Sequence, residues 1–171
     1  MEQLPNWVIT LRSLSWSTAG QVMLAAALGG VIGIEREWRG RPAGFRTNIL
    51  IAIGSCLFTI LSIDGFPLNG STAQDSARVA AQIVSGVGFL GAGALLQTRN
   101  KTKGMTTAAT IWLVAAIGMA VGTESYFLAI FTTLLTAAVL QLLRPVSKLV
   151  EHEGKLHKQV REEEPAPDEE Q

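Results

Sequence analysis

The first 143 residues contain very little charge, and this scarcity argues against an ordinary soluble domain. Of the 28 Asp, Glu, Lys and Arg residues in the chain, 13 follow Leu143. The preceding stretch is therefore much poorer in charge than a soluble domain, in which roughly a quarter of the residues are charged. Helices that are apolar all round leave no face for water, so we expect lipid to surround most of this stretch.

Cysteine and histidine are also scarce. Cys56 is the only cysteine, which excludes a disulfide framework and favours a role in core packing. The two histidines, His152 and His157, lie near the end of the chain. Their spacing places them about 140° apart on a helix, so a solvated charged helix is favoured over a zinc site. No basic residue precedes Arg12, so we expect the first span to act as its own insertion signal.

Five uncharged runs are present, and each is long enough to cross a bilayer. The hydrocarbon core is about 30 Å thick and a helix rises about 1.5 Å per residue, so roughly 17 to 25 residues are required. The sequence therefore predicts an all-α fold, a polytopic membrane helix bundle with about five transmembrane helices. The predicted spans are residues 18–35, 46–63, 78–97, 105–122 and 125–143.

Three regions follow from this pattern. Residues 1–17 form an interfacial amphipathic segment, because Leu4, Trp7 and Leu11 recur at helical spacing. Residues 18–143 form the transmembrane bundle. Residues 144–171 form a charged cytoplasmic tail that is partly disordered, since the chain becomes acidic and contains proline there.

The basic residues of the connections predict the orientation. Lys and Arg are retained on the cytoplasmic side. The first and third connections are rich in them, the second has only Arg78 at its edge, and the fourth has none. We therefore expect the amino terminus outside the cell and the tail in the cytoplasm. The basic residues of the first connection are Arg36, Arg39, Arg41 and Arg46, and those of the third are Arg99, Lys101 and Lys103.

A shift of sixty positions superposes parts of two hairpins. Gly33 falls on Gly93, and Gly44 falls on Gly104. Both hairpins would run inward and back, so this suggests a parallel hairpin repeat of the kind found in some transporters. The alternative is that the bias of membrane helices toward small residues produces the match by chance.

Glycines cluster in the predicted spans and indicate helix-packing faces. Helices in lipid associate through close backbone approach at small residues, with GxxxG spacing as the typical pattern. Gly86 to Gly91 also spell GxGxxG, but a dinucleotide site requires a strand before it, so we favour packing or a break in the helix. The predicted helix-packing residues are Gly29, Gly33, Gly86, Gly88, Gly91, Gly93, Gly118, Gly122 and Trp112.

One candidate polar site lies at the cytoplasmic ends of the spans. Threonine can cap a helix there, and Glu35 is a natural partner for free N–H groups or for Arg46. Ionisable residues in membrane segments are often functional, although an interfacial salt bridge is an equally reasonable interpretation. The candidate residues are Glu35, Arg36, Arg46, Thr47, Thr106 and Thr107.

A second candidate site lies at the opposite end. Asp75 precedes Arg78 by three residues, a spacing that allows pairing on a helix, and Gln82 follows one turn later. Together they would form a polar stripe that enters the bundle from outside. The alternative is that Arg78 simply extends to the lipid headgroups.

Four sequence blocks resemble the MgtC/SapB family of membrane proteins, which is associated with magnesium transport. These blocks are residues 33–37, 43–47, 85–93 and 104–109 followed by Trp112, in matching order and spacing. The resemblance covers roughly residues 20 to 145 and implies a bacterial inner-membrane protein linked to magnesium-poor growth or stress. It also implies that longer relatives carry a further cytosolic domain.

Several functions remain open at this point. We expect a non-enzymatic bundle, with no cofactor or resident metal, that modulates other membrane proteins in ion homeostasis. We also expect a homo-oligomer, most simply a dimer, within the lipid bilayer and no nucleic-acid partner. An ion channel or transporter is the alternative. An intramembrane hydrolase is disfavoured, because no predicted span holds a histidine to activate a hydroxyl.

Overall fold

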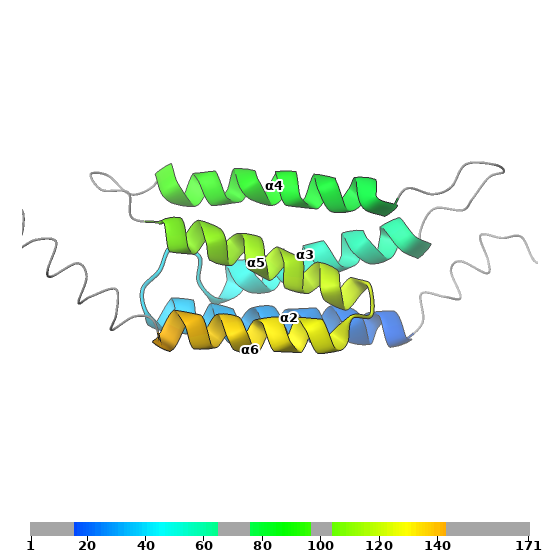
Figure 1. Cartoon of the computed structure of the whole chain (residues 1–171), viewed down its shortest axis with the longest axis horizontal. Helices are drawn as coiled ribbons and strands as arrows, with labels where there is room; N and C mark the ends of the chain where they lie inside the picture. The colour runs from blue at the N-terminus through cyan, green and yellow to red at the C-terminus, as the bar shows by residue number, and fades with distance from the viewer. Residues whose placement is uncertain (1–15, 65–75, 97–103, 143–171) are drawn as a thin grey trace, which may run out of the picture. The chain divides into compact units, whose positions relative to one another are not determined.

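The computed structural model of the chain describes residues 16–64, 76–96 and 104–142, and all of the regular structure within them is helical (Figure 1). Four helices are long and apolar enough to span a bilayer, and α6 is a shorter apolar helix. The predicted all-α, multi-pass membrane bundle is therefore confirmed. The helices are α2 (Trp16–Trp38), α3 (Phe45–Asp64), α4 (Ser76–Leu96), α5 (Met105–Gly122) and α6 (Tyr126–Leu142).

Some sequence predictions fall outside these residues. They include most of the interfacial segment 1–17, the tail 144–171, Asp75 and the two histidines. By its internal contacts the chain divides into Met1–Leu135 and Thr136–Gln171, a boundary that falls within α6. The packing below concerns the first of these units.

Local backbone chemistry explains where the helices end. Gly40 follows α2 with φ of 61°, and its N–H donates to the Glu37 carbonyl at 2.9 Å. This left-handed residue is the usual end of an α-helix, and glycine adopts it without steric cost. Glu124 has φ of 60° in the short turn between α5 and α6, where the Ser125 N–H donates to the Ala120 carbonyl at 2.8 Å.

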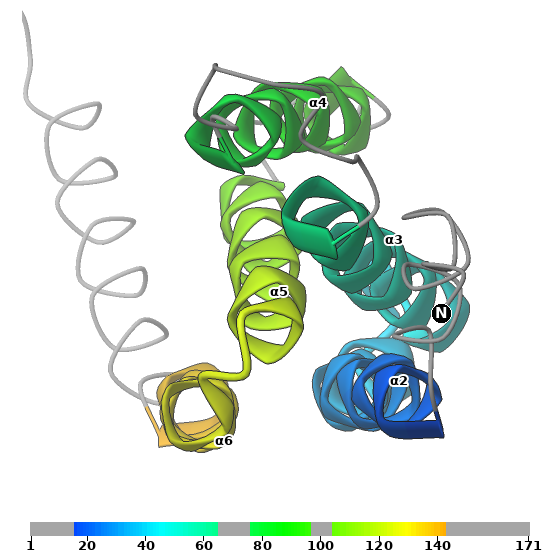
Figure 2. The ribbon, with the colours of Figure 1, turned by 90° about the vertical axis from the view of Figure 1, so that its right-hand side faces the viewer.

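Helix α3 is the centre of the packing. It contacts both α2 and α5, whereas α4 packs mainly on α5, and the views of Figures 1 and 2 show α3 and α5 between α2 and α4. Consecutive helices run in opposite directions (Figure 1). Short connections produce this arrangement, because they join neighbouring helices at one end of the bundle.

Two GxxxG pairs, one on α2 and one on α5, pack against the same helix, α3. A Cβ added at Gly29 of α2 would lie 2.7 Å from the Ala52 Cβ, and one added at Gly118 of α5 would lie 3.1 Å from the Ala52 Cα. A Cβ added at Gly33 would lie 2.8 Å from the Cα of Phe45, and one added at Gly122 would also approach α3 closely. Ala52 is fully buried between the two glycine faces, so close backbone approach holds α2, α3 and α5 together.

Helix α4 uses its glycines differently. Gly91 would bring a Cβ within 3.5 Å of Ala108 on α5, an ordinary contact. Gly86, Gly88 and Gly93 have no atom within 4 Å of an added Cβ among the described residues. The helix also continues through the GxGxxG segment, so the alternative of a break there is wrong.

Two further predicted packing residues can be placed. Trp112 on α5 is 51% exposed, and its predicted packing role stays a prediction. Cys56 on α3 is fully buried, which confirms its prediction as a core residue. Ring size explains the difference, because only small side chains fit where the helix backbones approach closely.

The parallel repeat stays a prediction. Helices α3 and α5 begin sixty positions apart, at Phe45 and Met105, as the repeat requires. The matched glycines nevertheless have different environments, since Gly33 touches the α3 backbone whereas Gly93 has open space around it.

Candidate functional site

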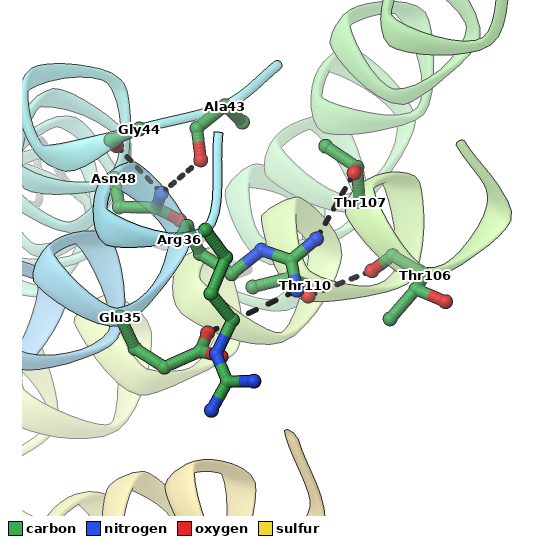
Figure 3. A network of polar contacts seen from close by, with 9 residues as sticks. Glu35, Arg36, Ala43, Gly44, Asn48, Thr106, Thr107 and Thr110 are labelled. Atoms are coloured by element: carbon green, nitrogen blue, oxygen red, sulfur yellow. Dashed lines mark hydrogen bonds and ion pairs between the residues drawn. The ribbon is translucent and has the colours of Figure 1, made fainter. Parts of the chain in front are cut away.

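A network of charged and polar side chains lies at one end of the bundle, which we call the arginine end. It is the end where α2 finishes and α3 and α5 begin, and it contains Arg36, Arg39, Arg41 and Arg46 (Figures 1 and 3). Three segments that are distant in sequence meet there. They are the last turns of α2, the connection 39–44 with the first turn of α3, and the first turn of α5.

Glu35 and Arg36 are the centre of this network, and both are buried. The Nη2 of Arg36 donates a hydrogen bond to the Thr107 Oγ1 on α5 at 3.1 Å (Figure 3). The Nη1 of Arg36 lies 3.9 Å from the Glu35 Oε2. Arg39 forms an ion pair with the other oxygen of Glu35 from one helical turn further along. The carboxylate is therefore neutralised by two guanidinium groups.

Helix geometry brings these charges together. Residues four apart lie on the same helical face, which aligns Glu35 with Arg39. A charge that is removed from water is costly unless it is paired, and the exposed fraction of Arg36 is only 3%. The pairing within α2 and the bond to α5 thus allow a guanidinium to lie inside the bundle.

Asn48 connects the network to the loop before α3. Its Nδ2 donates to the Ala43 carbonyl at 3.0 Å and to the Gly44 carbonyl at 2.8 Å. On the exposed side, the Glu37 Oε2 accepts a hydrogen bond from the Phe45 N–H at 2.8 Å. These bonds hold the connection between α2 and α3 in one conformation.

Some buried polar atoms in this network have hydrogen-bonding capacity to spare. Among the described residues, no hydrogen bond reaches the Nε of Arg36 or the Oδ1 of Asn48, and neither oxygen of Glu35 accepts one beyond its ion pairs. A buried polar group without a partner is costly and is often found at functional positions. The spare capacity of Arg36 and Asn48 therefore marks this network as the candidate functional site.

The structure corrects two details predicted for this site. Glu35 pairs with Arg36 and Arg39, so the predicted partnership with Arg46 is wrong. Arg46 is exposed and lines a cavity of 430 Å³ beside Trp38. Glu35 pairs with Arg36 and Arg39 because these residues lie on the same helix and are already aligned before any tertiary contact forms.

The predicted threonine cap of α5 is also wrong. The cap position is Gly104, with no capping side chain, and Thr107 instead accepts the bond from Arg36. The carbonyl of Thr106 accepts a bond from the Thr110 hydroxyl at 2.7 Å. Thr47 of α3 is exposed and lines a cavity between α3 and α4.

Two members of the network were absent from the predicted site residues. Arg39 was considered only for orientation, although its spacing of four from Glu35 on a helix could have indicated the ion pair. Asn48 is a fully buried amide within an apolar run. Its polarity at a membrane span was the signal that could have singled it out.

The second predicted site is described only in part. Arg78 and Gln82 are both exposed and lie on α4, and Asp75 lies outside the described residues. Gln82 lines the cavity between α3 and α4. Since α4 begins at the end opposite to the arginine end, the structure does not bring these residues together with Glu35.

Comparison with known proteins identifies relatives of the chain. Residues 22–149 match the model of the MgtC family. The chain is 45% identical over 130 residues to "Putative magnesium transporter YhiD" from Escherichia coli strain K12, covering 74% of this chain and 60% of that protein. It is 42% identical over 139 residues to "Protein MgtC" from Brucella abortus strain 2308, covering 80% of this chain and 56% of that protein.

The chain thus spans little more than half the length of these curated relatives. No solved structure matches it significantly.

Proposed function

Because the chain belongs to the MgtC family, we propose that it is a non-enzymatic membrane protein that acts in magnesium-linked ion homeostasis by modulating another membrane protein. The relatives are bacterial, which supports a place in the bacterial inner membrane. The arginine end would face the cytoplasm, because basic residues are retained on that side. This orientation puts the start of α2 outside.

The observation that carries this proposal is the pairing of Glu35. Magnesium is bound through carboxylate oxygens and water, so a magnesium pathway through the bundle would need an available carboxylate. Glu35 is a buried carboxylate, and Arg36 and Arg39 already lie against its two oxygens. Two guanidinium groups at the same place would also repel a divalent cation. The network therefore supports a fixed structural or regulatory role rather than cation passage.

The surface of α4 supports the modulating role. Gly88 has open space beside it, and the neighbouring Phe89 is 81% exposed. Small residues beside an exposed aromatic ring suit close packing against another membrane helix. This face could serve a different protein or a second copy of the chain, and a dimer is the simplest self-association.

An ion transporter remains the second candidate, for two reasons. A cavity of 590 Å³ lies between α3 and α4, with Thr47, Ser55 and Gln82 among its lining residues. The name of the YhiD relative also refers to magnesium transport.

Flux measurements separate the two functions. We would reconstitute the purified full chain in liposomes with an internal Mg²⁺ indicator and compare it with a known magnesium channel. No Mg²⁺ uptake above empty liposomes is expected. Uptake by the chain that survives removal of contaminating proteins would overturn the modulator proposal in favour of transport.

Photo-crosslinking in cells tests the modulator role directly. A photo-reactive amino acid at Phe89 on α4 should capture a second membrane protein. The matched control places the same group at Met23 on α2, which is similarly exposed at 73%. If Phe89 captures only further copies of this chain, or nothing that Met23 does not also capture, the modulator role is refuted.

A further inference from the structure

The cavity between α3 and α4 has the form of a narrow apolar groove. Its walls run from Thr47 to Phe58 on α3 and from Val79 to Leu90 on α4. The twelve residues on each side span eleven helical steps, a length of about 16 Å. The hydrocarbon core of a bilayer is about 30 Å thick, so the groove is about as long as one leaflet is deep.

Glycine on both walls gives the groove its depth. Gly54 of α3 and Gly86 of α4 line it, and each has no atom within 4 Å of an added Cβ. Apart from Thr47, Ser55 and Gln82, the lining side chains are apolar or absent. A cavity of 590 Å³ is in the size range of small-ligand sites, which is roughly 300 to 1,000 Å³.

The position and the lining of the groove indicate what can fill it. The groove lies between two helices that are long and apolar enough to cross a bilayer, and nearly all of its lining is apolar, so it suits the acyl chains of the surrounding lipid. A single hydrocarbon chain is thin, flexible and apolar, and suits a groove of this shape.

The groove also continues toward the arginine end. Thr47 and Leu90 line a second cavity of 230 Å³ as well, and this cavity reaches Pro42 and Gly93. Pro42 directly follows Arg41, which is exposed. Residues 35–46 contain four arginines and two glutamates, a net charge of +2. The mouth of the groove is therefore apolar inside and basic outside.

We propose that this groove binds one acyl chain of an anionic phospholipid, whose phosphate lies at the arginine end near Arg41. The apolar walls accommodate the hydrocarbon, and the basic side chains attract the headgroup, as clustered basic residues beside membrane helices do. This site is independent of the proposed modulator function, because it uses the face between α3 and α4 rather than the exposed face around Phe89.

Native mass spectrometry of the full chain tests the proposal. Protein purified in detergent would be titrated with phosphatidylglycerol or with phosphatidylcholine, and the bound lipids counted. We expect one phosphatidylglycerol per chain, retained several-fold better than phosphatidylcholine. Gly86→Leu, which fills the groove without striking a neighbour, should reduce retention at least tenfold.

Matched variants distinguish loss of the site from loss of the fold. Gly88→Leu on the same helix also enters open space but lies outside the groove, and it should bind lipid as the original chain does. Gly54→Leu fills the groove from the opposite wall and should reproduce the effect of Gly86→Leu. Thermal unfolding of all three should stay close to that of the original chain, which shows that they are folded.

Several outcomes would overturn the assignment. Equal lipid retention by the Gly86→Leu and Gly88→Leu variants would place the lipid elsewhere. Equal retention of the two lipids would show that the arginine end does not select an anionic headgroup. Loss of a dimer peak in the Gly86→Leu spectrum, with lipid unchanged, would assign the groove to a second copy of the chain.

Discussion

The substitution Gly118→Ala tests how much the close packing of the glycine faces on α3 contributes to stability. The new Cβ would clash with the carbonyl oxygen of Ala52 and lie 3.1 Å from its carbonyl carbon and its Cα, which are all backbone atoms and cannot rotate away. Overpacking of this kind costs about 1 to 3 kcal/mol. The higher helix propensity of alanine offsets up to about 1 kcal/mol of this loss of stability. We therefore expect a net loss of about 1 to 2 kcal/mol.

Gly88→Ala is the matched control, because the same methyl group there meets no atom within 4 Å. It should leave stability unchanged or raise it by up to about 1 kcal/mol. The two variants should thus differ by about 2 kcal/mol, a factor of roughly 30 in the unfolding equilibrium. Reversible unfolding in mixed micelles of a mild detergent and dodecyl sulfate, followed by circular dichroism, measures this difference. Equal midpoints for the two variants would refute the packing role assigned to Gly118.

Three further substitutions test the arginine end by the same unfolding measurement. Arg36→Leu leaves the buried Glu35 carboxylate with one partner fewer and should lower the free energy of unfolding by about 3 kcal/mol. A loss below about 1 kcal/mol would contradict the burial of this ion pair. Thr107→Val keeps the shape of the side chain but removes the acceptor of the hydrogen bond from Arg36. We expect a smaller loss of unfolding free energy, about 1.5 kcal/mol. No loss would mean that the hydrogen bond is absent. Asn48→Ala removes two hydrogen bonds to the connection between α2 and α3 and should lower the free energy of unfolding by about 2 kcal/mol. It should also speed proteolysis of that connection. An unchanged rate of proteolysis would count against the role of Asn48.

The positions of the spans could be predicted from the sequence because length and hydropathy alone determine them. Helix α5 was predicted at residues 105–122 and lies at Met105–Gly122. The GxxxG pairs of α2 and α5 were also recognisable, since small residues at that spacing are the main means of close approach in lipid. These features depend on one segment at a time.

The partners of the polar residues were harder to predict, because they depend on how each helix is rotated. A span that is apolar all round has no polar face to indicate which side meets a neighbour. The sequence therefore did not indicate that Arg36 would meet Thr107. It also did not distinguish Gly118, which touches α3, from Gly88, which does not.

The bond between Arg36 and Thr107 also has a consequence for the order of assembly during synthesis. The two residues are 71 positions apart, so α2 enters the membrane well before its acceptor has been made. Until α5 arrives, the guanidinium of Arg36 can remain solvated only if that end of α2 stays among the lipid headgroups. The last turns of α2 would then settle to their final depth only after the fourth span has been inserted. A nascent chain that stops before Gly104 would keep this arginine in contact with water.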